Sequence, residues 1–182
     1  VLHPNIYKYE EIFKQEGWHY ELEDKDAPIT INGVVYNEMK EAFSSPDDVL
    51  EREIMSSLFP DTTYANVAGG DPEHIPELTY EQYLDFHRKY YHPSNSYIYL
   101  YGDMNIAEKL QWLDEEYLSK YEKMELDSAI ELQKPFIKPI EVIREYPIAT
   151  GEAEEDNTYL SYNMVIGTIL DKKLYQAFDI LD

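Results

Sequence analysis

The sequence predicts an α+β fold, in which helices pack on a mainly antiparallel sheet and a second α+β domain begins towards the C-terminus. Three observations lead to this prediction. Several segments place apolar residues three and four positions apart, which is typical of helices with one buried face. Shorter segments alternate apolar and polar residues, or consist of strand-favouring residues. The composition also shifts after about Lys123.

Start and stop signals locate the elements of the first part. Gly17 ends a first helix, and serine followed by proline at Ser45-Pro46 opens a later one. Thr79 and Gln82 form a capping box, with each side chain placed to satisfy the other residue's backbone. In chain order we expect helices at 5–15, 31–43, 46–58, 79–91 and 105–121, strands at 18–22 and 97–101, and an irregular connection over 60–78.

The domain organisation follows from the change in composition. We expect residues 1–123 to be the C-terminal part of a first domain and residues 124–136 to be a linker. Residues 137–182 would then open a second domain, with strands at 137–148 and 159–166, an acidic loop at 151–157 and a helix from about Asp171. Because the chain starts at Val1 rather than at methionine and stops within an apolar helical pattern, we expect both ends to be cuts.

The composition excludes several classes of function. The chain has 182 residues, of which 43% are hydrophobic, so a packed core is expected. It has no cysteine, which excludes disulfides, thiol nucleophiles and thiolate metal sites. A formal net charge of -22 repels nucleic acid and anionic membrane surfaces, whereas it tolerates cationic peptides and divalent metals. No run reaches the ~20 apolar residues that span a membrane.

Glu38 is the residue that first suggests chemistry. In a helix over 31–43, it would project from an arc shared with the apolar residues Ile31, Val34, Val35, Met39 and Ala42. A carboxylate on a buried face is costly unless it is paired, neutralised or bound to a metal. The periodicity alone favours a buried ion pair, or a helix shallow enough for Glu38 to reach water, over a metal ligand or an acid with a raised pKa.

Other catalytic or cofactor-binding residues are not expected in this chain. His87 and His92 are five positions apart and lack the spacing of a helical histidine pair, and His87 falls on an apolar stripe where a packed histidine is expected. The remaining histidines, His3, His19 and His74, are isolated in the sequence. Neither HExxH nor HxxEH occurs, the serines lack a nucleophile-elbow context, and the Gly69-Gly70 pair is too short for a phosphate loop.

A series of motifs, taken together, resembles a known family. Gly33-Val34-Val35-Tyr36-Asn37-Glu38-Met39-Lys40 with Ser45-Pro46-Asp47 resembles the distal-glutamate helix of the insulinase/pitrilysin metallopeptidases, and more specifically that of the presequence-protease subfamily. Further matches follow in the family's order, at residues 58–64, 69–72, 75–76, 78–80, 86–87, 90–96 and 101–103. They cover about residues 15–120, whereas residues 135–182 resemble the family's second domain less specifically.

The resemblance implies an incomplete metallopeptidase domain with part of a zinc site. In this family two histidines and a general-base glutamate come from an HxxEH helix, and a distal glutamate, here Glu38, completes the zinc ligands. The HxxEH helix and the substrate-binding edge strand would lie before Val1, and the second half of the peptide chamber after Asp182. Many relatives also have a glutamate seven residues before the distal ligand, where this chain has Ile31.

The sequence therefore predicts an internal part of a zinc endopeptidase that degrades peptides, with Glu38 as its one metal ligand. We expect the isolated chain to be inactive, to bind zinc weakly and to self-associate through bare apolar surface, and we expect a cytoplasmic location. The alternative is a non-catalytic member of the same superfamily that serves as a structural or peptide-binding subunit. A third possibility, an unrelated acidic binding module, would lack this ordered series of motifs.

Overall fold

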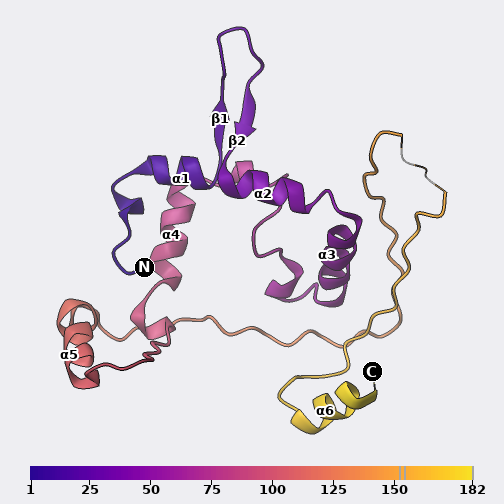
Figure 1. The fold of residues 1–182 in the computed structure, drawn as a ribbon. Helices are drawn as coiled ribbons and strands as arrows, with labels where there is room; N and C mark the ends of the chain where they lie inside the picture. The colour runs from indigo at the N-terminus through magenta and orange to yellow at the C-terminus, as the bar shows by residue number, and fades with distance from the viewer. Residues whose placement is uncertain (152, 154, 182) are drawn as a thin grey trace. The chain divides into compact units, whose positions relative to one another are not determined.

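The computed structural model describes residues 1–151, 153 and 155–181 (Figure 1). Within these residues, helices are the main regular structure and one antiparallel hairpin supplies the strands. The fold class is therefore α+β, as predicted. The α-helices are α1 (Glu10–Glu16), α2 (Val34–Ala42), α3 (Pro46–Leu58), α4 (Tyr80–Tyr90), α5 (Ile106–Glu116) and α6 (Lys172–Leu181), and the strands are β1 (His19–Glu21) and β2 (Thr30–Asn32). Short 3₁₀ helices lie at Asn5–Tyr7, Thr63–Ala65, Ile75–Glu77, Pro93–Asn95 and Leu118–Lys120.

The chain forms two compact units. The first consists of Val1–Tyr36 and Glu73–Ala129, and the second of Asn37–Pro72 and Ile130–Asp182. Helix α2 begins in the first unit and continues in the second. These units cut the chain at other places than the predicted domains 1–123 and 137–182, whose boundaries stay a prediction.

The first unit is organised by contacts of the N-terminal segment with α4. The buried side chains here are Ile6, Ile75 and Leu84. The Tyr80 hydroxyl donates to the carbonyl of Ile6, and the Phe13 ring of α1 lies 5.5 Å from the ring of Tyr83. Aromatic residues therefore do much of the packing between α1 and α4.

Local capping signals correctly located the starts of α4 and α5, whereas the helix predicted at 5–15 is a short 3₁₀ helix followed by α1. The Thr79 side chain accepts from the backbone N–H of Gln82 at 3.2 Å, and the Gln82 side chain accepts from the N–H of Thr79 at 2.8 Å. Asn105 caps α5 by accepting from the N–H of Glu108. These two starts agree with the prediction because each uses residues within one turn.

In the second unit, polar contacts join the segment after residue 130 to α3. Val49 of α3 is buried, and Glu53 accepts a hydrogen bond from Arg144 Nε at 2.9 Å. The Gln133 amide exchanges two hydrogen bonds with Asp61, of 3.0 and 2.7 Å. Part of the predicted linker, together with residues that follow it, is therefore held against the α3 region.

Several strand predictions were wrong. Residues 97–101, 137–148 and 159–166 have no ladder partner among the described residues. Tyr97, Tyr99 and Tyr101 are instead almost fully exposed. Strand-favouring side chains express a preference, but a strand forms only when a neighbour accepts its backbone hydrogen bonds. Of the acidic loop expected at 151–157, residues 152 and 154 lie outside the described part.

The predicted helix over 31–43 starts later than expected. Ile31 belongs to β2, where it pairs with Tyr20 in a register that also matches His19 with Asn32 and Glu21 with Thr30. Gly33 then separates the strand from α2. The helical prediction failed at this end because pairing with β1 decides the conformation of Thr30–Asn32.

The chain leaves much surface uncovered. Its accessible surface is 15677 Å² for a mass of 21.5 kDa. Two separate compact domains of half that mass would together expose about 11,000 Å². The chain therefore exposes more surface than two such compact domains would. Within the described residues, no helix combines the length and apolar character that crossing a membrane requires.

Candidate functional site

Hydrogen bonds tie the start of α2, the helix that carries Glu38, to the hairpin and to Gly17. The Asn32 side chain accepts from the Gly33 N–H and donates to Glu21 of β1, both at 2.8 Å. The N–H of Tyr36, in the first turn of α2, donates to the carbonyl of Gly17 at 3.3 Å. Because the first N–H groups of a helix lack partners within the helix, this carbonyl caps α2 from outside.

Gly33 is buried where the chain passes close to the turn after α1. A Cβ atom at Gly33 would lie 2.2 Å from the Gly17 oxygen and 2.7 Å from the Cα of Trp18. Its φ of 157° is also one that residues with side chains rarely adopt. The position therefore requires glycine.

Glu38 itself is exposed on α2. This corrects the expectation of a buried apolar arc, since α2 has no buried residue, Val34 is 43% exposed and Ile31 is not part of the helix. Across the described residues, no hydrogen bond or ion pair reaches its carboxylate. Of the two structural interpretations, the helix is thus the shallow one that lets Glu38 reach water, and no buried ion pair forms.

The carboxylate fits a zinc site as one ligand. Carboxylate oxygens bind zinc, but a closed or catalytic site needs three or four donors from the protein. The described part of the chain contains no group of three histidine, cysteine, aspartate or glutamate residues that could hold a metal ion. Any such site would need ligands from beyond these residues, and Glu38 as a metal ligand stays a prediction.

His87 and His92 both use ring nitrogens in hydrogen bonds within the first unit. The carbonyl of Val1 can only accept, so His87 Nε2 donates to it at 3.0 Å and Nδ1 accepts from the Tyr7 hydroxyl at 2.7 Å. The His87 ring also stacks on Tyr91 at 4.7 Å. His87 is therefore a packed histidine, as predicted, and neither of its nitrogens is open to a metal. In His92, Nδ1 accepts from the N–H of Ser94 at 3.1 Å.

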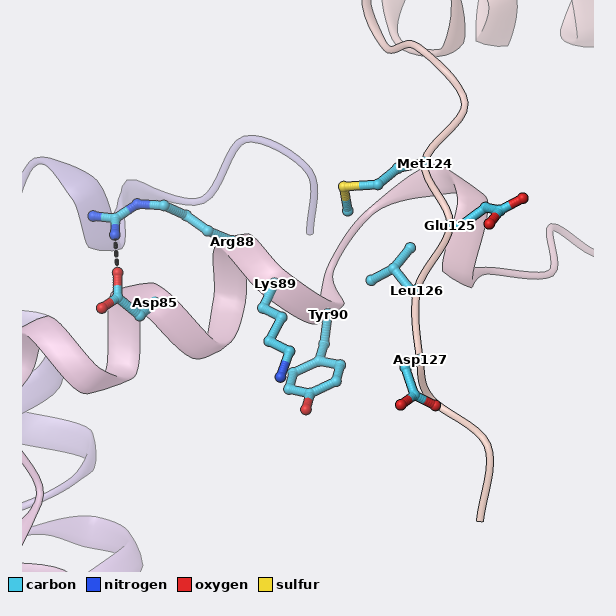
Figure 2. A pocket seen from close by; sticks show the side chains of 8 residues that line it. All are labelled: Asp85, Arg88, Lys89, Tyr90, Met124, Glu125, Leu126 and Asp127. Carbon is cyan, nitrogen blue, oxygen red and sulfur yellow. Dashed lines mark hydrogen bonds and ion pairs between the residues drawn. The ribbon is translucent and has the colours of Figure 1, made fainter. Parts of the chain in front are cut away.

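A shallow pocket lies between the end of α4 and residues 124–127 (Figure 2). Met124 and Leu126 face Lys89 and Tyr90 across it. The Lys89 ammonium lies 4.8 Å from the centre of the Tyr90 ring, and Arg88 pairs with Asp85. No pattern in the sequence predicted this pocket, because residues 124–127 have the composition of a linker.

The phenol of Tyr83, on α4, has a shifted pKa. Burial raises the pKa of the Tyr83 phenol above its ordinary value of 10.0, and the neighbouring Tyr91 and Glu16 add to this effect because their negative charge disfavours the phenolate. Tyr83 lies on α4 beside Phe13, at a packing position. This shift therefore reflects packing.

Comparison with known proteins identifies the family. The profile of the peptidase M16 inactive domain matches residues 77–182. Protein HypA of Clostridium perfringens is 52% identical over 181 residues, which is 100% of this chain and 19% of that protein. Presequence protease 1, chloroplastic/mitochondrial, of Arabidopsis thaliana is 46% identical over 74% of this chain and 13% of its own length. The mitochondrial presequence protease of Danio rerio is 39% identical over 87% of this chain and 16% of its own length.

The chain thus spans less than a fifth of the length of each of these three relatives. Glu38 lies within the match to HypA but outside the match to the inactive-domain profile. The sequence motifs, the profile and the relatives agree: the chain belongs to the insulinase-type M16 peptidase family and is similar to presequence proteases.

Proposed function

We propose that this chain is an internal part of a zinc-dependent endopeptidase that degrades peptides, and that Glu38 supplies one zinc ligand. The observation that carries the proposal is an exposed carboxylate without a partner among the described residues, on a helix whose first turn is fixed by backbone contacts. Two relatives that are named presequence protease support the peptidase activity of the longer polypeptide.

The role of Glu38 in this proposal is to hold the metal. One of its carboxylate oxygens would bind zinc together with donors from elsewhere in the polypeptide. Bound zinc supplies a water of lowered pKa and polarises the peptide carbonyl. The chain by itself would bind zinc weakly and would not hydrolyse peptides, since one carboxylate cannot form such a site.

The proposed partners follow from charge and exposed surface. A net charge of -22 favours cationic peptide substrates and disfavours nucleic acid. The exposed apolar side chains would be covered by the remainder of the same polypeptide, or by self-association when that remainder is absent. The cytoplasmic location stays a prediction, and two of the relatives are named for organelles.

A second candidate is a non-catalytic superfamily member, which the description of the matched profile as an inactive domain favours. That profile covers residues 77–182 and leaves out α2. An exposed glutamate at position 38 is compatible with both candidates, so metal binding has to separate them.

The test compares zinc content and peptide hydrolysis in the longer polypeptide that contains this chain. The proposal expects about one zinc per molecule and hydrolysis that a chelator abolishes. Glu38→Gln should lower zinc affinity at least about tenfold and remove hydrolysis, whereas Glu41→Gln, an exposed glutamate on the same helix, should change neither. Zinc-free wild-type protein without hydrolysis would support the non-catalytic candidate instead.

A further inference from the structure

We infer that Gly33 is a positioning residue for Glu38, because its close contact with the Gly17–Trp18 backbone fixes where α2 starts. The inference rests on the proposed function, in which Glu38 binds zinc. It assigns a role in metal binding to a residue that has no ligand atom of its own.

The contact is between backbone and backbone, so no change of rotamer can relieve it. A Cβ at Gly33 would meet the oxygen of Gly17 at 2.2 Å, its carbon at 2.7 Å and the Cα of Trp18 at 2.7 Å. Ordinary contact for such an atom begins at 3.4 Å. Any larger residue at position 33 must therefore separate the two segments by roughly 1 Å.

The segment opposite Gly33 is held in place from both sides. The N–H of Gly17 donates to the carbonyl of Phe13 at 2.8 Å, which ends α1. The indole N–H of Trp18 donates to the carbonyl of Leu78 at 2.9 Å, just before α4. Because α1 and α4 anchor this side of the contact, we expect the start of α2 to be the side that moves.

Moving the start of α2 also breaks its cap. The N–H of Tyr36 donates to the carbonyl of Gly17 at 3.3 Å, which is already a long hydrogen bond. A further separation of about 1 Å would remove it and leave the first turn without that partner. Asn32 also helps to hold the start of α2 in place, since its side chain links the Gly33 N–H to Glu21 of β1.

The displacement should reach Glu38 because Gly33 directly precedes α2, and α2 is a continuous helix that contains Glu38. Glu38 lies one turn after Val34, the first residue of α2. Zinc sites tolerate deviations of only about 0.2 Å in ligand distance. A shift of about 1 Å should therefore weaken zinc binding, by about 10- to 100-fold if it acts like the loss of a group that orients a ligand.

The experiment measures zinc affinity in the longer polypeptide by competition with a chromogenic chelator, and records the visible spectrum of the cobalt-substituted protein. The variants are Gly33→Ala, Glu38→Gln and Gly151→Ala as the matched control. Gly151 also has positive φ, but a Cβ there meets no atom within 4 Å. Circular dichroism and thermal unfolding establish that each variant folds.

We expect folded Gly33→Ala to raise the zinc Kd about 10- to 100-fold and to shift the cobalt spectrum towards that of Glu38→Gln, while Gly151→Ala matches wild type. A folded Gly33→Ala protein with wild-type zinc Kd would overturn the inference, as would an equal loss in Gly151→Ala. If Gly33→Ala does not fold, Asn32→Ala takes its place, with a Kd raised at least threefold expected and an unchanged Kd overturning the inference. A wild-type zinc Kd in Glu38→Gln would instead refute the proposed function.

Discussion

Replacing Arg144 by glutamine should loosen the contact between α3 and the segment after residue 130. Arg144 Nε donates to one oxygen of Glu53 at 2.9 Å, across 91 residues of sequence. The other oxygen of Glu53 lies 3.6 Å from Arg52, whose guanidinium also lies 4.0 Å from the centre of the Phe43 ring. Glu53 thus joins two arginines, of which only Arg144 comes from the distant segment.

The expected magnitude follows from exposure. The Arg144 side chain is 58% exposed and that of Glu53 is 21% exposed, so solvent screens much of the attraction. Exposed pairs typically contribute 0.2–1 kcal/mol, and the partial burial of Glu53 with direct hydrogen-bond geometry favours the upper half of that range. We therefore expect a coupling of about 0.5–1 kcal/mol between Arg144 and Glu53.

A double-mutant cycle with Arg144→Gln and Glu53→Gln measures that coupling by urea unfolding of the chain. The cycle is needed because Glu53→Gln alone also weakens the contact with Arg52. Lys138→Gln is the control, since it removes a positive charge from the same exposed segment and accounts for the general effect of charge on so acidic a chain. A coupling within 0.2 kcal/mol of zero at low salt would refute the reasoning, as would one that does not fall at about 1 M salt.

Three further predictions concern α4. Thr79→Ala should lower the free energy of unfolding by about 1 kcal/mol through loss of the cap, and Thr79→Ser should restore most of it; equal stability of the two variants would contradict this. Leu84→Ala should cost about 2–3 kcal/mol in urea unfolding because it empties part of a small core, and a cost below 1 kcal/mol would show that the site collapses or is not packed. Because burial raises the pKa of Tyr83, the unfolded state releases this proton more readily, so stability should be complete below pH 10 and fall as the pH rises above it. Tyr83→Phe should lack that part of the alkaline loss when unfolding is compared at pH 9 and pH 11.

The sequence predicted best those elements that local residues decide. The capping box of Thr79 and Gln82, the cap at Asn105 and the proline in the first turn of α3 each act within one turn, and each helix starts where predicted. The segments at 97–101, 137–148 and 159–166 have strand-favouring residues but no partner in the described chain. A strand depends on a second segment, so its residues alone could not decide the outcome.

At the candidate site, too, features that depend on distant contacts could not be predicted from local residues. Helical periodicity placed Glu38 on a buried arc, but no residue of α2 is buried, and Ile31, which was counted in that arc, pairs with Tyr20 in the hairpin. The choice of Glu38 as a ligand therefore depends on the family resemblance. The role inferred for Gly33 could not come from periodicity, since it depends on a contact with Gly17 sixteen positions earlier.

The most direct test of the central claim is a crystal structure of the longer polypeptide with diffraction data collected at the zinc absorption edge. The proposal predicts an anomalous peak with a Glu38 carboxylate oxygen about 2.0–2.2 Å from the metal. An occupied zinc site with the Glu38 carboxylate outside the coordination shell would contradict it.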